Sequence, residues 1–347
     1  MKQMTLAGTV LLGAWLNAGC CHFSCRSEPA GRPPLPAPVA ARFTYPKPFP
    51  LECRETNLAT EARFGVTRVE LPALNDRLGS NRTLALDFYQ PRGAGRHAVI
   101  LVLPTAGGTY PLEKHFAAYF ARHGFAAVIV RRPIKIGELK QIESVDALFQ
   151  QSVLDNKLVL DWIETRSELD ASRIGVFGVS MGAIQGALLT PLDRRVSAAV
   201  LGLVGGDLPY VLTYSTERGV TRRRKAFLGE HKLTLAQLHA SLQQNVSCDP
   251  NAFAPYVNPA KVMLVLGYCD TVVPYKKGWE LRRRMGKPET ILLPTGHYTA
   301  LLYLPYIRRQ TLGFFRHRLN ETAVLPRAER TSGFGDDPAA PFFGQAP

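Results

Sequence analysis

From residue 97 to residue 319, runs of apolar residues alternate with segments of helical spacing. Runs such as HAVILVLP and FAAVIV are continuous aliphatic stretches, which are typical of strands buried on both faces of a sheet. The segment LEKHFAAYFARHG places Phe116, Tyr119 and Phe120 along one side of a helix that stops at Gly124. This alternation predicts a parallel sheet with helices on both of its faces.

The order of the expected elements is regular along the chain. Two leading strands, GVTRVELP and LALDFYQP, lie between residues 63 and 90, and we expect them to be antiparallel. Further strands are expected in HAVILVLP, FAAVIV, RIGVFG, VSAAVLGLV, KVMLVLG and TILLP, and helices in ALFQQSVLDNKLVLDWIETR, in MGAIQGALL, near residues 276–285 and from about residue 299. More than fifty residues separate the strand near Val204 from the one at Lys261, far more than an ordinary connection. We expect this insertion, about residues 207–258, to form a helical cap.

The N-terminus has the pattern of an export signal. Lys2 is followed by an apolar run, Met4 to Leu16, which is too short to span a bilayer, and residues 1–20 are therefore interpreted as a signal peptide. The ending Ala18-Gly19-Cys20 resembles a bacterial lipobox, in which Cys20 would carry the lipid and attach the protein to a membrane. Cleavage near this point without lipidation is the alternative. Both interpretations place the mature protein outside the cytoplasm, periplasmic, membrane-anchored or secreted.

Two segments flank the expected domain, which spans residues 61–319. Residues 21–60 are rich in proline, as in PAGRPPLPAPVA, and predict a stiff, extended spacer. Residues 320–347 lose apolar periodicity, and we expect a disordered tail. The formal net charge is +14, but the basic residues form short, scattered clusters without a nucleic-acid-binding motif. We therefore expect a basic surface and no nucleic-acid partner.

The six cysteines do not follow a metal-binding pattern. Cys20, Cys21 and Cys25 lack a second Cys/His pair at zinc-finger spacing. In an exported protein, two of Cys53, Cys248 and Cys269 could form a disulfide, but buried free thiols fit the sequence equally well. We expect neither a metal nor another cofactor.

The segment RIGVFGVSMGA contains the strongest catalytic signal. Gly178-Val179-Ser180-Met181-Gly182 matches G-x-S-x-G, with a buried strand before it and an amphipathic helix after it. This strand–turn–helix context is that of a nucleophile elbow, and it makes Ser180 the candidate nucleophile. A serine that only caps the helix is the alternative, but it does not explain both glycines.

A serine nucleophile needs a base and a carboxylate further along the chain. His297 follows TILLPTG, a strand and a turn, and is the candidate base. Asp270 follows VMLVLGYC at the end of another strand and is the candidate acid, and Asp207 is the rival acid. The other downstream histidines, His231, His239 and His317, lie in helical stretches.

GVSMGA around Ser180, GYCDTVVP around Asp270 and GHY around His297 together resemble the α/β-hydrolase superfamily, and within it the dienelactone hydrolase-like and prolyl-oligopeptidase-like branch. The resemblance covers residues 63–319. It implies a mostly parallel, eight-stranded sheet and hydrolysis through an acyl-enzyme.

An oxyanion hole is also expected from the resemblance. Met181 should supply one backbone N–H, as the residue after the nucleophile, and Ala106 the other, with Gly107 as the next candidate. The loop LPTAGGTYP departs from the family, because Pro104 stands where a histidine is common. The expected activity is hydrolysis of a small carboxylic ester. A serine peptidase and a non-catalytic binding protein of the same fold remain alternatives.

Overall fold

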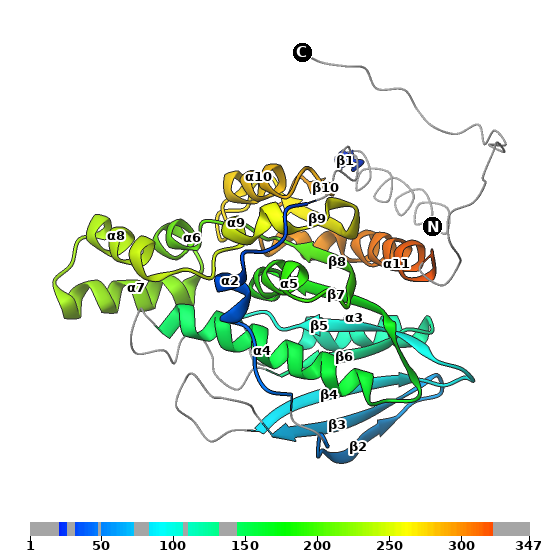
Figure 1. Cartoon of the computed structure of the whole chain (residues 1–347). Helices are drawn as coiled ribbons and strands as arrows, with labels where there is room; N and C mark the ends of the chain where they lie inside the picture. The colour runs from blue at the N-terminus through cyan, green and yellow to red at the C-terminus, as the bar shows by residue number, and fades with distance from the viewer. Residues whose placement is uncertain are drawn as a thin grey trace, which may run out of the picture.

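A ten-stranded mixed sheet forms the centre of the molecule in the computed structural model (Figure 1). The structure describes residues 21–25, 32–47, 50–72, 83–106, 110–131 and 144–321. The order of the strands across the sheet is β1-β10-β9-β8-β7-β5-β6-β4-β3-β2. The predicted signal peptide, the predicted lipidation site at Cys20 and most of the predicted tail lie outside the described residues.

Six neighbouring strands are parallel. They are β10 (Glu289–Leu293), β9 (Val262–Gly267), β8 (Val196–Gly202), β7 (Leu169–Val179), β5 (His97–Leu103) and β6 (Ala126–Val130). Residues of β5, β6, β8 and β9 are buried almost without exception, which explains their continuous apolar runs. The carboxyl ends of these strands meet at one edge of the sheet.

Antiparallel strands complete both ends of the sheet. At one end, β6 pairs with β4 (Thr83–Pro91), which pairs with β3 (Phe64–Pro72) and then β2 (Arg54–Thr60). At the other end, β1 (Cys21–Phe23) pairs with β10. The predicted leading strands are β3 and β4, and they are antiparallel as expected.

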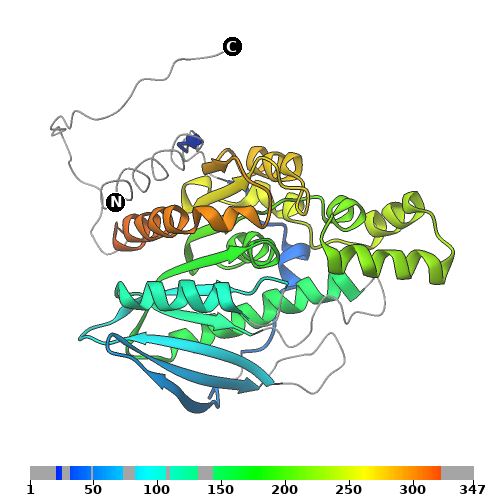
Figure 2. The same ribbon diagram turned by 180° about the vertical axis from the view of Figure 1, so that it is seen from behind.

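Helices cover both faces, so the predicted fold class is confirmed. One face is covered by α4 (Ser144–Glu164), α5 (Met181–Leu192) and α10 (Tyr275–Arg284). The opposite face is covered by α3 (Pro111–Arg122) and α11 (Leu304–Glu321), with η4 (Thr299–Tyr303) before α11 (Figure 2). No helix among the described residues is long and apolar enough to cross a membrane.

The sheet has ten strands rather than eight because residues 21–60, predicted to be an extended spacer, contain β1 and β2. Each of these strands pairs with a strand edge that would otherwise be unpaired. Between them, α2 (Ala37–Ala41) and the following residues cross the outer side of α4 (Figure 1). Phe43 is fully buried there, and its carbonyl accepts a hydrogen bond from Lys157 Nζ at 2.9 Å.

A polar network joins the same segment to α4. The hydroxyl of Tyr45 donates to Asp161, and Arg195 Nη1 donates to Asp161 Oδ1 at 2.7 Å. Burial raises the pKa of Asp161, but these hydrogen bonds and others outweigh burial and hold the pKa below its usual value. The described residues of the Pro-rich segment are therefore part of the folded domain.

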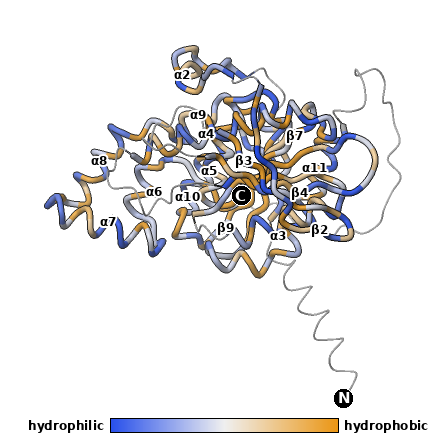
Figure 3. Tube along the Cα trace, turned by 90° about the horizontal axis from the view of Figure 1, so that it is seen from below, coloured by the Kyte–Doolittle hydropathy of each residue, from blue (hydrophilic) through white to orange (hydrophobic). Residues whose placement is uncertain are grey.

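The insertion between β8 and β9 is helical. It contains α6 (Leu208–Tyr214), α7 (Arg218–His231), α8 (Leu235–Asn245) and α9 (Pro250–Phe253), followed by η2 (Ala254–Tyr256) and η3 (Pro259–Lys261). Figure 3 shows α7 and α8 extending to one side of the sheet, with hydrophilic residues along α7. Leu238 and Leu242 of α8 are buried against the domain.

Candidate active site

Ser180 lies on a sharp turn between β7 and α5. Its φ is 56° and its ψ is −120°, a strained backbone conformation for a residue with a side chain. The two flanking glycines permit this turn, because there is no space for a side chain at either position. A Cβ on Gly178 would lie 2.4 Å from the carbonyl carbon of Gly182, and a Cβ on Gly182 would lie 2.3 Å from the carbonyl oxygen of Leu103. The G-x-S-x-G spacing therefore has a steric cause.

The hydroxyl of Ser180 does not cap α5. Ser180 occupies the N-cap position, but its side chain makes no capping hydrogen bond. Its Oγ instead lies 3.0 Å from Nε2 of His297. The interpretation of Ser180 as an ordinary helix cap is therefore wrong.

Asp270 and His297 come from two neighbouring loops at the carboxyl ends of β9 and β10. Nδ1 of His297 lies 2.7 Å from Oδ2 of Asp270, and both side chains are largely buried. Two backbone hydrogen bonds join the loops: Tyr268 N–H donates to Leu293 at 2.8 Å, and Cys269 N–H donates to Thr295 at 3.0 Å. The relative position of acid and base is thus held by the backbone.

The second oxygen of Asp270 is also engaged. Oδ1 accepts hydrogen bonds from the backbone N–H groups of Val272 at 2.9 Å and Val273 at 3.0 Å. The rival acid Asp207 has a different role, since it caps α6 and lies 2.5 Å from Lys277 Nζ. The structure therefore brings Asp270, and not Asp207, to His297.

The remaining downstream histidines lie away from Ser180 in the helices expected for them. His231 stacks on Phe227 in α7, and His239 in α8 contacts the rings of Tyr210 and Tyr214. His317 lies in α11. None of the three lines a cavity that contains Ser180.

The loop after β5 also lies close to Ser180. Ala106 lines the same cavities as Ser180, and Met181 is the first residue of α5. Gly107, the alternative oxyanion residue, lies outside the described residues. The loop is held by Glu113 of α3, whose Oε1 accepts a hydrogen bond from the backbone N–H of Thr105 at 2.6 Å.

Sequence reasoning did not single out Glu113. Its side chain is buried, and Oε2 has no hydrogen-bond partner in the described part of the chain. A buried carboxylate costs free energy unless it is hydrogen-bonded, and the hydrogen bond from Thr105 N–H to Glu113 offsets part of this cost. The sequence feature that could have indicated Glu113 is an acidic residue on the apolar side of an amphipathic helix.

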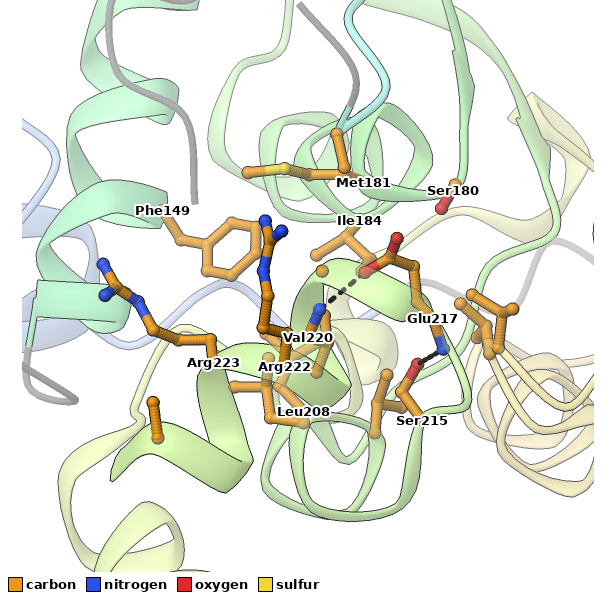
Figure 4. A pocket seen from close by; sticks show the side chains of 17 residues that line it. Phe149, Ser180, Met181, Ile184, Leu208, Ser215, Glu217, Val220, Arg222 and Arg223 are labelled. Atoms are coloured by element: carbon orange, nitrogen blue, oxygen red, sulfur yellow. Dashed lines mark hydrogen bonds between the residues drawn. The ribbon is translucent and has the colours of Figure 1, made fainter. Parts of the chain in front are cut away.

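Two cavities open at Ser180, and Ala106 and Glu217 line both of them. The cap cavity, about 480 Å³, is lined by Phe149, Met181, Ile184 and residues of α6 and α7 (Figure 4). The α11 cavity, about 470 Å³, is lined by Leu112, Phe116, His297, Leu304 and Ile307, among others. Both are mainly apolar and fall in the size range of small-molecule sites.

The described cysteines form no disulfide with one another. Cys21, Cys25, Cys53, Cys248 and Cys269 are all free thiols, so no pair among Cys53, Cys248 and Cys269 is bridged. Within the described ranges, no group of three or more His, Cys, Asp or Glu side chains is arranged to hold a metal ion.

Solved structures with similar folds include esterases. An acetyl xylan esterase from Paenibacillus sp. R4 has a TM-score of 0.62 and 18% identity, covering 78% of this chain and 90% of that chain. Acetyl Xylan Esterase 1 from Thermoanaerobacterium sp. JW/SL YS485 has a TM-score of 0.60 and 15% identity, covering 81% and 95%. A cold-adapted esterase from an Arctic intertidal metagenomic library has a TM-score of 0.53 and 19% identity, covering 78% and 100%. The chain has the α/β-hydrolase fold.

Sequence comparison adds two relatives but no activity. Uncharacterized proteins from Mycobacterium tuberculosis strains H37Rv (Rv2627c) and CDC 1551 / Oshkosh (MT2702) are each 28% identical over 184 residues, 52% of this chain. That region is only 40% of each relative's length. No family model matches the chain.

Proposed function

We propose that this protein is a serine hydrolase that cleaves carboxylic esters through Ser180, His297 and Asp270. The observation that carries the proposal is the continuous series of contacts, 3.0 Å from Ser180 to His297 and 2.7 Å from His297 to Asp270, at the opening of two cavities. A serine hydroxyl becomes an effective nucleophile when an oriented imidazole accepts its proton.

In the proposed mechanism, Nε2 of His297 takes the proton of Ser180 as Oγ attacks the ester carbonyl. The backbone N–H groups of Met181 and Ala106 stabilise the oxyanion that forms. Asp270 keeps the proton of the imidazole on Nδ1 and stabilises its positive charge. His297 then protonates the departing alcohol, and a water molecule, deprotonated by the same imidazole, releases the acid from Ser180.

Two other functions are compatible with the same residues. A serine peptidase would use the same triad on amides, and a binding protein would use the cavities without turnover. The esterase structures with similar folds favour esters over peptides. The strained Ser180 backbone favours catalysis over binding, because such strain persists where the surrounding structure enforces a functional geometry.

A fluorophosphonate probe tests the proposal. We expect stoichiometric labelling of the wild-type protein and none of Ser180→Ala, with Ser197→Ala as a matched control that labels normally. Hydrolysis of 4-nitrophenyl acetate, compared with peptide 4-nitroanilides, then separates esterase from peptidase. Absence of labelling in folded wild-type protein would support the binding protein instead.

We also propose that the protein is exported, on the signal-like pattern of residues 1–20. Intact mass of native protein from a bacterial host should show removal of the signal, with additional lipid mass if Cys20 is acylated. Full-length protein beginning at Met1 in the cytoplasm would contradict export, and cleavage without added mass would contradict lipidation.

A further inference from the structure

Ser180 lines both the cap cavity and the α11 cavity, and the helices that line the two cavities cover opposite faces of the sheet. The two cavities have similar volumes, about 480 and 470 Å³. A site for esters of small acids, such as acetate, needs space on one side of the scissile bond only. Two cavities of this size provide space for large groups on both sides.

The position of His297 distinguishes the two cavities chemically. His297 lines the α11 cavity and does not line the cap cavity. The imidazole must deliver its proton to the departing oxygen, so the alcohol part of the ester lies on the His297 side. The acyl part then extends from Ser180 into the cap cavity, past Met181 and Ile184.

The lining of the α11 cavity is apolar away from the reacting groups. Leu112, Phe116, Leu304 and Ile307 contribute aliphatic and aromatic surface from both helices that cover this face. A bulky apolar alcohol would be desolvated here without leaving a buried polar group unpaired.

The end of the cap cavity beside Ser180 carries a negative charge. Glu217, the N-cap of α7, lies beside Ser180 in Figure 4, and its Oε2 accepts a hydrogen bond from Val220 N–H at 2.6 Å. Burial raises the pKa of Tyr298, and the negative charge of Glu217 raises it further. The carboxylate of Glu217 therefore lies near the loop that carries His297. An anionic substrate group beside the scissile bond would therefore be repelled.

The other end of the cap cavity is basic. Arg222 and Arg223 of α7 line it, and Figure 4 shows the side chain of Arg222 next to the ring of Phe149, with Ile184 between it and Ser180. Arg222 forms no ion pair with any carboxylate among the described residues. A guanidinium at this position can bind a carboxylate in a charge-assisted contact.

We propose that the substrate is an ester whose acyl chain fills the cap cavity and ends in an anionic group at Arg222, and whose bulky apolar alcohol fills the α11 cavity. This assignment rests on the proposed ester hydrolysis. The bond from Ser180 Oγ to the acyl carbon forms first and gives the oxyanion; the ester C–O bond then breaks, and the serine proton leaves on the alcohol. Water then cleaves the acyl-enzyme, and the released acid carries two anionic groups.

Two 4-nitrophenyl esters with acyl chains of similar length test the anionic end. The adipic acid monoester ends in a carboxylate, and the heptanoate ends in a methyl group. We expect Arg222→Gln to lower kcat/KM for the monoester by about tenfold or more and to change the heptanoate by less than about twofold. Lys225→Gln removes a charge from α7 outside both cavities. This control should change the ratio of kcat/KM for the monoester to kcat/KM for the heptanoate little.

Salt provides an independent measurement. The preference of the wild type for the monoester should fall as ionic strength rises, because screening weakens a solvent-accessible charge pair. Equal wild-type turnover of both esters at low salt, or equal loss of both in Arg222→Gln, would overturn the assignment of an anionic end.

Tryptophan substitutions at two partly exposed positions test which cavity takes which group. Val220→Trp should reduce kcat/KM for 4-nitrophenyl octanoate relative to the acetate. Leu304→Trp should reduce kcat/KM for 2-naphthyl acetate relative to methyl acetate. Each variant should leave the relative kcat/KM of the other pair of esters nearly unchanged. Reversed responses would overturn the assignment of acyl and alcohol sides.

The proposed function and this assignment fail differently. If the wild type neither labels with fluorophosphonate nor hydrolyses 4-nitrophenyl acetate, ester hydrolysis itself is wrong. If it does both while the selectivity tests fail, the hydrolase remains and only the substrate class is refuted. Melting temperatures of the variants, compared with the wild type, identify any loss that is due to unfolding.

Discussion

Asp270→Asn tests the proposed triad with a change of one atom in the side chain. The carboxylate uses both oxygens, because Oδ1 accepts from Val272 and Val273 N–H and Oδ2 faces His297 Nδ1 at 2.7 Å. An amide has one acceptor and one donor. With its oxygen toward the two backbone N–H groups, its NH₂ faces His297 and requires an unprotonated Nδ1. The imidazole proton then sits on Nε2, which can no longer accept the proton of Ser180.

The size of the effect follows from the cost of turning the amide over. The flipped amide restores the productive tautomer but leaves two buried backbone N–H groups without an acceptor, at about 1–3 kcal/mol each. The flipped form is thus disfavoured by about 2–6 kcal/mol, which makes it about 30 to 2 × 10⁴ times less populated. It also lacks the negative charge that stabilises the imidazolium. We therefore expect kcat to fall by about 10³- to 10⁴-fold.

The assay is kcat for 4-nitrophenyl acetate per active site, together with thermal unfolding. Asp270→Asn should melt close to the wild type, because its oxygen still accepts from both backbone groups. Asp207→Asn is the matched control, and its kcat should stay within about twofold, because Asp207 interacts with Lys277 and not with His297. The reasoning is refuted if Asp270→Asn retains more than about a tenth of the wild-type kcat, or if Asp207→Asn causes the large loss.

Three further predictions concern the same molecule. Ser180→Ala and His297→Ala should each lower kcat by about 10⁴-fold or more, and the double variant should be little worse; additive losses in kcat would contradict a triad that acts as a unit. Glu113→Ala should lower kcat about 10-fold or more with little change in KM, because the loop that carries Ala106 loses its anchor, whereas Glu113→Gln keeps an acceptor and should retain most of the activity; equal losses would contradict a positioning role. The folded-state pKa of Asp161 lies below its usual value, so its contribution to stability is present above about pH 4 and is lost as pH falls through the folded-state pKa. Asp161→Asn should therefore lower the melting temperature at pH 7 and reduce its further fall in acid, and an unchanged pH dependence would contradict this.

The sequence by itself determined the architecture of the parallel strands and the turn at Ser180. Burial on both faces requires continuous apolar runs, and a glycine on each side of Ser180 is required because a Cβ would overlap backbone atoms. These are local properties, so periodicity and spacing reveal them. Chain order within a recognisable fold then indicated Asp270 and His297.

Only the tertiary structure decided how segments distant in sequence meet. The Pro-rich residues 21–60 have no strong strand pattern, and β1 and β2 form because unpaired strand edges accept them. Glu113 reaches Thr105 because α3 packs beside the loop after β5. Glu217 and Arg222 line the cavity with Ser180 because the insertion packs beside the turn at Ser180, although Glu217 lies 37 positions after Ser180 in the sequence (217 − 180). Such contacts depend on packing between elements, which the spacing of residues within one element does not encode.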